Sequence, residues 1–235
     1  MKILALDTAL AGCSVCVLDT DSGPRHKEAH KDVRPMSRGQ VEALIPMAQD
    51  VMTQAGLEFA DLDLIATTIG PGAFTGLRIG LSAARGFALS LGKPLIGFTT
   101  LEVLAQQFMQ EHKMAAHERI AVILETKRSD FYFQIFDSQG QEITAPQALE
   151  SPEITGDMHC IGDALERFRA QAGAFGESVH FYEGYNLPDP EILAHMACKK
   201  YESDGSQDSI VPAPLYLRSP DVSQPKAAQR VLSGA

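Results

Sequence analysis

The stretch that decides how this chain is organised reads Ile69-Gly70-Pro71-Gly72-Ala73-Phe74-Thr75-Gly76-Leu77-Arg78-Ile79-Gly80. The apolar run of residues 62–69 leads into it and has the length and composition of a buried strand. A helical pattern rich in small residues follows and reaches Leu91. The stretch therefore predicts a strand, a tight glycine turn and a helix, in that order.

The glycine turn has two interpretations. Glycines at a helix N-terminus leave backbone N–H groups available to a phosphate. The Walker motif needs Lys and Ser/Thr after its last glycine, whereas Leu77 and Arg78 follow Gly76. The Gly-x-Gly-x-x-Gly dinucleotide motif is also missed, because the third glycine comes one residue late. A tight turn with close helix packing is the simpler interpretation.

The helix that begins at Phe74 has two adjacent apolar faces. At 3.6 residues per turn, the first is formed by Phe74, Leu77, Leu81, Ala84, Ala88 and Leu91. The second is formed by Gly76, Ile79, Gly80, Ala83, Gly86 and Phe87. A helix on one side of a sheet needs a single apolar stripe, so the second face predicts a neighbouring helix or a partner protein. Its small residues would let another backbone approach closely.

A second amphipathic helix is predicted from a capping-box pattern at Ser37 up to Gly56, with Pro46 inside it. We expect the two helices to form the partner or dimer interface together. The residues predicted for this interface are Val41, Leu44, Ile45, Ala48, Gly76, Ile79, Gly80, Ala83 and Phe87.

Composition limits the classes of function. The chain has 235 residues, of which 45% are hydrophobic and 21% charged, with a net charge of -10. This acidic balance argues against a dedicated nucleic-acid-binding surface, which needs dense Lys and Arg to replace counterions. A local basic patch is left at Arg25, Lys27, Lys31, Arg34 and Arg38. Its alternative interpretation is a solvated edge strand that discourages aggregation.

The sequence predicts a cytoplasmic protein that does not associate with membranes. It contains no apolar span of 18 residues, and its first apolar run is too short for a signal peptide. Cys13 and Cys16 lie three residues apart in a predicted strand, so their side chains should point to opposite faces. We therefore do not expect them to share a metal or a disulfide.

The order of predicted elements gives the fold class. Three strands in a meander followed by alternating helices and strands form the half-unit of a ribonuclease-H-like fold. The pattern begins again near residue 119 in a trimmed form. The prediction is an α/β protein with two such subdomains, at residues 1–100 and 101–218. Residues 219–235 contain few large apolar side chains and are predicted to be a disordered tail.

Five motifs together resemble the bacterial TsaB (YeaZ) family over residues 1–218. They are Asp7-Thr8, Leu44-Ile45-Pro46-Met47, the block of residues 70–80, Thr99-Thr100-Leu101-Glu102 and Pro214-Leu215-Tyr216-Leu217-Arg218. The Gly-Pro-Gly-x-Phe-Thr-Gly block is shared with the paralogous family TsaD. The resemblance implies two actin-like (ASKHA) subdomains and a role in making threonylcarbamoyladenosine beside the anticodon of tRNA.

The resemblance also implies that the chemistry belongs to a partner. TsaD carries a metal-binding His-x-x-x-His pair near the start of its first long helix, whereas residues 37–42 contain no histidine. Actin-like ATP clefts need a second glycine-rich phosphate loop, but residues 124–130 contain no glycine. The chain is expected to be non-catalytic and to bind no cofactor, with ATP and metal in TsaD. Expected partners are TsaD and TsaE, with a homodimer when TsaD is missing and only indirect contact with tRNA.

Asp7 and Thr8 are the residues predicted for a vestigial nucleotide cleft. In actin-like ATPases an aspartate at this strand end orients a metal-bound water, but the second phosphate loop is missing here. Two alternatives stay open. One is a metal- or ATP-dependent enzyme, either a glycoprotease-type peptidase or a small-molecule kinase. The other is a tRNA-binding module that uses the basic patch.

Overall fold

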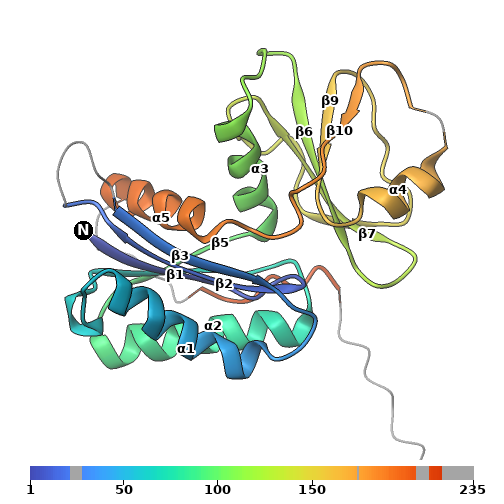
Figure 1. Ribbon diagram of the computed structural model, residues 1–235. Coiled ribbons are helices and arrows are strands. Elements are labelled where there is room, and N and C mark those ends of the chain that lie inside the picture. The colour runs from blue at the N-terminus through green and yellow to red at the C-terminus, as the bar shows by residue number, and fades with distance from the viewer. Residues whose placement is uncertain (22–27, 174, 205–211, 219–235) are drawn as a thin grey trace, which may run out of the picture.

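The computed structural model describes residues 1–21, 28–173, 175–204 and 212–218. It contains two five-stranded sheets with helices packed on them (Figure 1). Residues Arg25 and Lys27 of the predicted basic patch, and the predicted tail at 219–235, lie outside the described residues.

The first sheet has the order β3-β2-β1-β4-β5. Its strands are β1 (Lys2–Asp7), β2 (Gly12–Asp19), β3 (Glu28–Pro35), β4 (Leu64–Thr68) and β5 (Leu95–Phe98). β1 pairs antiparallel with β2 and parallel with β4, and β5 continues the parallel half. This order confirms the predicted ribonuclease-H-like meander followed by parallel strands.

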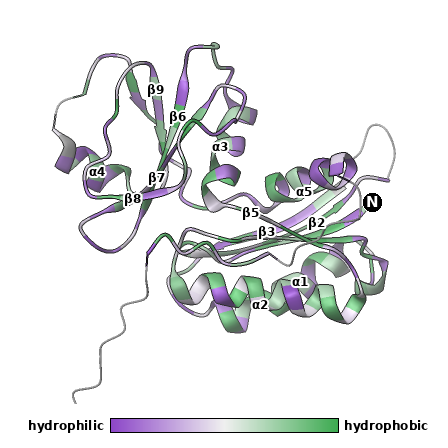
Figure 2. Cartoon of the chain, turned by 180° about the vertical axis from the view of Figure 1, so that it is seen from behind, coloured by the Kyte–Doolittle hydropathy of each residue, from purple (hydrophilic) through white to green (hydrophobic). Residues whose placement is uncertain are grey.

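Helices cover both faces of the first sheet (Figures 1 and 2). α1 (Gln40–Gln54) and α2 (Phe74–Leu91) lie on one face, and α5 (Pro190–Asp204) lies on the other. The central strands β1, β2 and β4 are buried on both faces because helices cover both. Cys13 packs in the core under α1 and α2 and Cys16 in the core under α5, so the two thiols point to opposite faces as predicted.

The second sheet repeats the same strand path, in the order β10-β9-β6-β7-β8. Its strands are β6 (Arg119–Glu125), β7 (Phe131–Asp137), β8 (Gln147–Leu149), β9 (Met158–Ile161) and β10 (Val179–Phe181). α3 (Thr100–Glu111) and α4 (Leu165–Ala172) pack on its two faces. Within the described residues no helix joins β8 to β9, which agrees with the predicted trimming of the second unit.

The last helix corrects the predicted subdomain boundaries. α5 lies within residues 101–218, yet it packs on the first sheet, with Leu193 and Ala197 against Ile3 and Ala5. The segment 212–218 also contacts the first unit, through a hydrogen bond from the N–H of Leu215 to the carbonyl of Ile69. The physical reason is that the second face of β1, β2 and β4 is mostly apolar, with Ile3, Ala5 and Leu64 among its side chains, and needs a covering helix.

Candidate functional site

The glycine turn that follows β4 packs against the turn between β1 and β2. The N–H of Ala73 donates to the carbonyl of Ala9 at 2.7 Å, and the hydroxyl of Thr8 donates to the carbonyl of Gly76 at 2.6 Å. The Ala73 N–H at the start of α2 is therefore already used inside the chain. A phosphate bound here would lose a donor that helix N-terminal anion sites depend on.

Two glycines of the predicted partner interface face this turn instead. Gly76 and Gly80 are both buried. A methyl group added at Gly76 would overlap the carbonyl oxygen of Thr8, and one added at Gly80 would lie 2.6 Å from the Thr8 hydroxyl oxygen. The prediction that these glycines admit a partner's backbone is wrong, because the backbone they admit is that of the chain's own β1–β2 turn.

Two residues of α1 in the predicted interface are also internal. Leu44 is 1% exposed and Ala48 is fully buried, and both belong to the core under the first sheet. They cannot contact a partner without unfolding of that core, so this part of the prediction is corrected as well. The helical spacing of its apolar residues placed Leu44 and Ala48 correctly on the apolar face of α1, but that face packs against the sheet.

Three other predicted residues line the junction of α2 with the core. Ile79, Ala83 and Phe87 are partly buried and pack against the same cluster as Leu44. The Phe87 ring stacks on Phe59, with centroids 5.0 Å apart. A neighbouring helix and loop of the chain thus cover part of the second apolar face of α2. The sequence had left open whether a neighbouring helix or a partner protein covers this face.

Some large apolar side chains of the layer formed by α1 and α2 are exposed to solvent. Val41 is 62% exposed and Ile45 is 41% exposed on α1, and Leu89 is 86% exposed on α2. Gly86 is exposed too, and a methyl group added there would meet no atom within 4 Å. Figure 2 shows α1 and α2 as one layer with hydrophobic residues along both helices. Sequence reasoning missed Leu89, although a large apolar residue within an otherwise polar arc was the available signal.

Asp7, at the end of β1, is fully buried on the opposite face of the sheet from α2. Its Oδ1 accepts from the Thr68 hydroxyl at 2.5 Å and from the N–H of Ala9 at 3.2 Å. Its Oδ2 is buried and makes no hydrogen bond with the described part of the chain. Burial disfavours the charged form and raises the pKa of Asp7 to about 6, against the lowering effect of the two hydrogen bonds.

Apolar side chains surround the β1–β2 turn next to Asp7. Leu10 is 5% exposed and packs in a cluster with Leu124 and Tyr185 of the second unit. The Leu187 side chain lies so close to Gly12 that an added methyl group would come within 2.6 Å of it. Of the predicted vestigial cleft, Asp7 is thus sealed in the interior, and Thr8 is turned to the α2 side.

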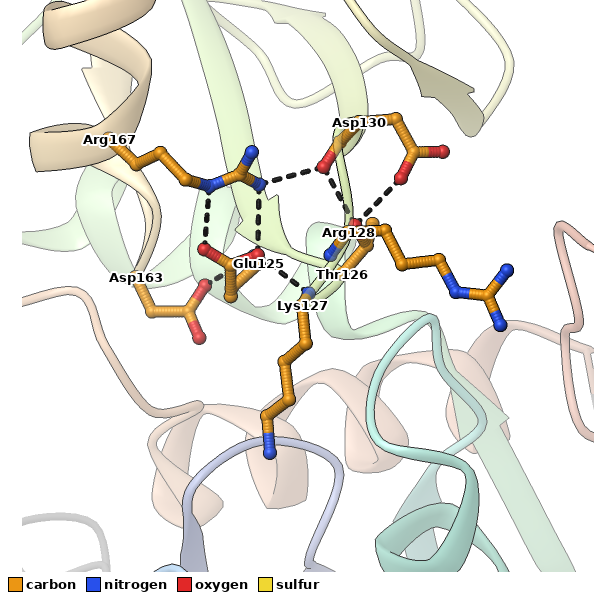
Figure 3. Close-up of polar contacts among 7 residues, drawn as sticks. All are labelled: Glu125, Thr126, Lys127, Arg128, Asp130, Asp163 and Arg167. Atoms are coloured by element: carbon orange, nitrogen blue, oxygen red, sulfur yellow. Dashed lines mark hydrogen bonds and ion pairs between the residues drawn. The ribbon is translucent and has the colours of Figure 1, made fainter.

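The corresponding turn of the second unit, residues 126–130, is closed by its own hydrogen bonds (Figure 3). The Thr126 hydroxyl contacts the Asp130 carbonyl and Oδ1, both at 2.7 Å. The N–H of Lys127 donates to Glu125 at 2.6 Å, and the N–H of Arg128 donates to the Thr126 hydroxyl oxygen at 3.2 Å. These two backbone donors are therefore used within the loop itself.

Glu125 ends β6 as Asp7 ends β1, but its charge is paired. Arg167 of α4 binds both Glu125 oxygens at 2.8 Å and also donates to the Asp130 carbonyl at 2.7 Å (Figure 3). The guanidinium lies 3.8 Å from the centroid of Phe131. The carboxylate of Asp163 accepts from the N–H of Glu125 at 2.8 Å, and burial raises the pKa of Asp163 to about 6. The arrangement is a partly buried structural network in which Arg167 Nη1 makes no hydrogen bond with the described part of the chain.

Other candidate sites in the described residues are weak. No group of three or more His, Cys, Asp or Glu side chains there is placed to hold a metal ion. Two surface hollows, of about 260 and 420 Å³, lie on the second unit, and neither is lined by Asp7 or Thr8. None of the described helices has the length and apolarity needed to cross a membrane.

The described part of the predicted basic patch is partly neutralised. Lys31 binds Asp189 at 2.7 Å and Glu191 at 2.9 Å, and Arg34 is paired with Asp32. The first two contacts tie β3 to the start of α5. This is the solvated-edge alternative, with a structural role in holding α5.

Comparisons with known proteins agree with this geometry. The family described as "TsaD: tRNA N6-adenosine threonylcarbamoyltransferase" matches residues 34–218. The Escherichia coli "tRNA threonylcarbamoyladenosine biosynthesis protein TsaB" is 28% identical over 93% of this chain and 95% of its own length. An Erythrobacter litoralis "tRNA N6-adenosine threonylcarbamoyltransferase" is 47% identical, but over only 28% of this chain and 19% of its own.

A solved structure shows the same fold over nearly the whole chain. It is a Pseudomonas aeruginosa protein described as similar to peptidase YEAZ, with a TM-score of 0.77, 25% identity, and coverage of 92% of this chain and 99% of that one. Its likeness supports two actin-like α/β units. Matched over residues 34–218 and similar along its whole length to TsaB and YeaZ proteins, the chain belongs to the TsaD family, on its TsaB (YeaZ) branch.

Proposed function

We propose that this chain is a non-catalytic partner subunit in tRNA threonylcarbamoyladenosine biosynthesis, and that it pairs with TsaD through the outer side of α1 and α2. The observation that carries the proposal is that both helices of this layer expose large apolar side chains. Val41 and Ile45 are exposed near the start of α1, and Leu89 is exposed near the end of α2, one helical turn from the open Gly86. Val41 and Ile45 are neighbours one turn apart on α1, and contiguous exposed apolar side chains mark surfaces that another protein covers. We define these four residues as the outer face.

The outer face replaces the interface predicted from the sequence. Ile79 and Ala83 are partly exposed beside it and can still contribute at its edge. Affinity would come mainly from burying apolar area, at roughly 25 cal/mol per Å² before the entropic costs of association. Because Gly86 carries no side chain, a partner helix could approach α2 most closely at that point.

The proposal leaves ATP and the metal ion to TsaD. In this chain the Ala73 N–H is occupied, Asp7 is sealed by apolar neighbours, and the loop at 126–130 uses its own donors. In the proposed assembly TsaE completes the working complex, and the chain pairs with a second copy of itself when TsaD is missing. The outer face would serve both pairings.

The test is a bulky residue at Gly86. Gly86→Leu should lower the affinity for TsaD of the same organism at least tenfold, because the added side chain separates the helices. It should not reduce the melting temperature, since the space is open within the chain and Leu favours a helix more than Gly does. Affinity would be measured by titration calorimetry and the assembly state by size-exclusion chromatography with light scattering.

Gly176→Leu is the matched control, because a methyl group there also meets no atom within 4 Å, in a loop of the second unit. It should leave TsaD binding unchanged. An unweakened complex with Gly86→Leu would show that the outer face is not the interface. Gly80→Leu is the wrong variant for this purpose, because it would clash with Thr8 inside the chain.

A further inference from the structure

Residues 212–218 form an extended strap that runs beside α2 and ends at the second unit. Its start lies against Gly97 of β5, where an added methyl group would come within 2.8 Å of Pro212. Its middle is held by the hydrogen bond from the N–H of Leu215 to the carbonyl of Ile69, at 2.7 Å. Six residue steps of extended chain span at most about 20 Å. The strap therefore links the two units over a distance of that order.

Three arginines hold successive points of the strap. Arg85 donates to the Pro212 carbonyl at 2.6 Å, and Arg78 donates through Nε to the Tyr216 hydroxyl at 3.1 Å. Arg218 forms an ion pair with Asp130, whose side chain is 2% exposed. A guanidinium has five N–H donors, so each of these arginines keeps donors beyond its contact with the strap. The result is a row of cationic groups along the strap.

The charge around this row differs from that of the whole chain. α2 and the strap contain no Asp or Glu, although the chain carries a net charge of -10. Beside Asp130, the side chains of Lys127 and Arg128 are exposed and point away from the Glu125–Arg167 pair (Figure 3). Within the described residues, the exposed Glu150 also reaches this loop and accepts from the Ser129 hydroxyl at 3.1 Å. The row therefore carries a local excess of positive charge.

Exposed aromatic rings accompany the arginines. Phe74 is 47% exposed and Tyr216 is 40% exposed, with ring centroids 5.5 Å apart. The Arg78 guanidinium lies 3.6 Å from the centroid of Phe74. Exposed rings among cationic side chains are the surface on which unpaired bases stack while the phosphates contact the cations. An acidic protein surface would match the charges but would not need the rings.

We propose that this strap face, formed by Arg78, Arg85, Arg128, Lys127, Arg218, Phe74 and Tyr216, binds RNA directly. Lys and Arg contact the phosphates and the rings contact exposed bases. Phe74, Arg78 and Arg85 lie on the side of α2 away from Ile79 and Ala83. Leu89 of the outer face follows Arg85 by one helical turn, so the two faces adjoin along α2. The inference rests on the proposed function only in taking a tRNA as the RNA. It replaces the expectation that the chain meets tRNA only through its partner.

The test neutralises two exposed cations of the loop at residues 126–130. Lys127→Gln combined with Arg128→Gln should weaken binding of a fluorescent tRNA transcript roughly tenfold, and should reduce the slope of log affinity against log salt by about 1 to 2. Binding would be followed by anisotropy over a salt series, with the full chain alone and with its TsaD complex. Lys113→Gln with Lys199→Gln removes the same charge elsewhere and should leave both quantities nearly unchanged.

A second pair of variants tests the rings. Tyr216→Phe keeps the ring and should bind RNA like the parent, whereas Tyr216→Leu should bind roughly tenfold more weakly. Equal melting temperatures for the two variants would show that the strap is still seated. The inference would be overturned if neither the full chain alone nor its TsaD complex bound RNA at low salt. It would also be overturned if the Lys127/Arg128 double variant and the Lys113/Lys199 control lost RNA affinity equally. Equal binding of a polyglutamate peptide would instead indicate an acidic protein partner.

The two proposals fail separately. Gly86→Leu tests the pairing with TsaD and leaves the strap face untouched. If Gly86→Leu leaves the TsaD complex intact while the Gln pair still weakens RNA binding, the proposed interface is wrong and the RNA face stands. The reverse outcome overturns the RNA face alone.

Discussion

In the first unit two helices, α1 and α2, cover one face of the sheet, whereas in the second unit the short helix α4 takes the corresponding place. Both units follow the same strand path, and both α2 and α4 connect the two parallel strands of their unit. α2 has 18 residues and exposes Leu89, while α4 has 8 residues and uses Arg167 to bind Glu125 inward. The additional helix therefore gives the first unit the surface that we propose for a partner.

The carboxylates at the ends of the corresponding strands β1 and β6 also differ in their surroundings. Asp7 of the first unit is buried with one oxygen unpaired, and Glu125 of the second is neutralised by Arg167. A nucleotide cleft needs such groups to be open to ligand and metal. The Asp7 carboxylate is enclosed in the interior and the Glu125 carboxylate is paired with a cation, so the two strand ends are closed by different physical means.

The largest expected effect comes from adding a methyl group at a glycine that packs closely against backbone, one in each unit. Gly76→Ala places a methyl group on the carbonyl oxygen of Thr8, and Gly162→Ala places one on that of Ile123. Each should cost about 3 kcal/mol or more of the free energy of unfolding, because the opposing atoms are backbone and cannot rotate away. Gly162→Ala should cost more, since Gly162 has φ of 124°. Urea denaturation followed by circular dichroism measures both.

Gly86→Ala is the control for this comparison. It lies in the same helix as Gly76 but in open space, so it should stabilise the protein by up to about 1 kcal/mol through helix propensity. If Gly76→Ala were as harmless as Gly86→Ala, the close packing of α2 on Thr8 would be incorrect. The comparison also separates packing from propensity, because both variants make the same chemical change.

The next largest effect is the pH dependence due to Asp7. Its pKa is about 6 in the folded protein and 3.8 in the unfolded reference, so between these values the folded state binds more protons. Stability from this group is therefore fully present below about pH 4 and is lost as the pH rises through 6. Asp7→Asn should be more stable than the parent by on the order of 2 kcal/mol at pH 7.5 and nearly equal to it at pH 4.

Asp163 offers the matching measurement in the second unit. Burial raises its pKa to about 6 as well, so Asp163→Asn should show the same direction of pH dependence. Its N–H contact from Glu125 can be kept by the amide oxygen of Asn. Denaturant titrations at pH 7.5 and pH 4 would measure the free energy of unfolding of both Asn variants and of the parent. An Asp7→Asn variant whose advantage grows toward pH 4 would contradict the assigned cause, which is burial of the charged form.

The strand order could be predicted from the sequence because local patterns determine it. Apolar runs bounded by turn residues mark the strands, and the β-β-β-α-β-α-β-α order has few ways to pack. The same reasoning could not place α5. Its apolar stripe, including Leu193 and Ala197, requires an apolar face but does not say which of two sheets supplies it. Nor could sequence position show that 212–218 would return to α2.

The candidate site was harder to predict for a related reason. A helical wheel gives the direction of Gly76, Gly80 and Leu44 but not the element that lies in that direction. All three face the chain's own sheet or turn. Only Val41 and Ile45 of the predicted set are exposed, and Leu89 was missed because it stands among polar residues. The expectation that residues 124–130 form no phosphate loop rests on the sequence, which lacks the glycines that such a turn requires.

The smallest expected effect concerns the N-termini of two helices, α3 on the second sheet and α1 on the first. α3, which covers the second sheet, has a capping box in which Thr99 accepts from the N–H of Glu102 at 3.0 Å and Glu102 accepts from the N–H of Thr99 at 2.6 Å. α1, which covers the first sheet, begins after Gly39 at φ of 94° with no side-chain cap, so the capping box predicted at Ser37 does not form.

Thr99→Ala should therefore cost about 1 kcal/mol of unfolding free energy, and Ser37→Ala should cost close to nothing. Both variants remove one hydroxyl next to a helix start, so their difference isolates the cap from the loss of the side chain. Parallel urea titrations of the two proteins provide the measurement. Equal losses would mean that Ser37 caps α1 in solution, and that the sequence pattern describes this helix start better than the left-handed Gly39 does.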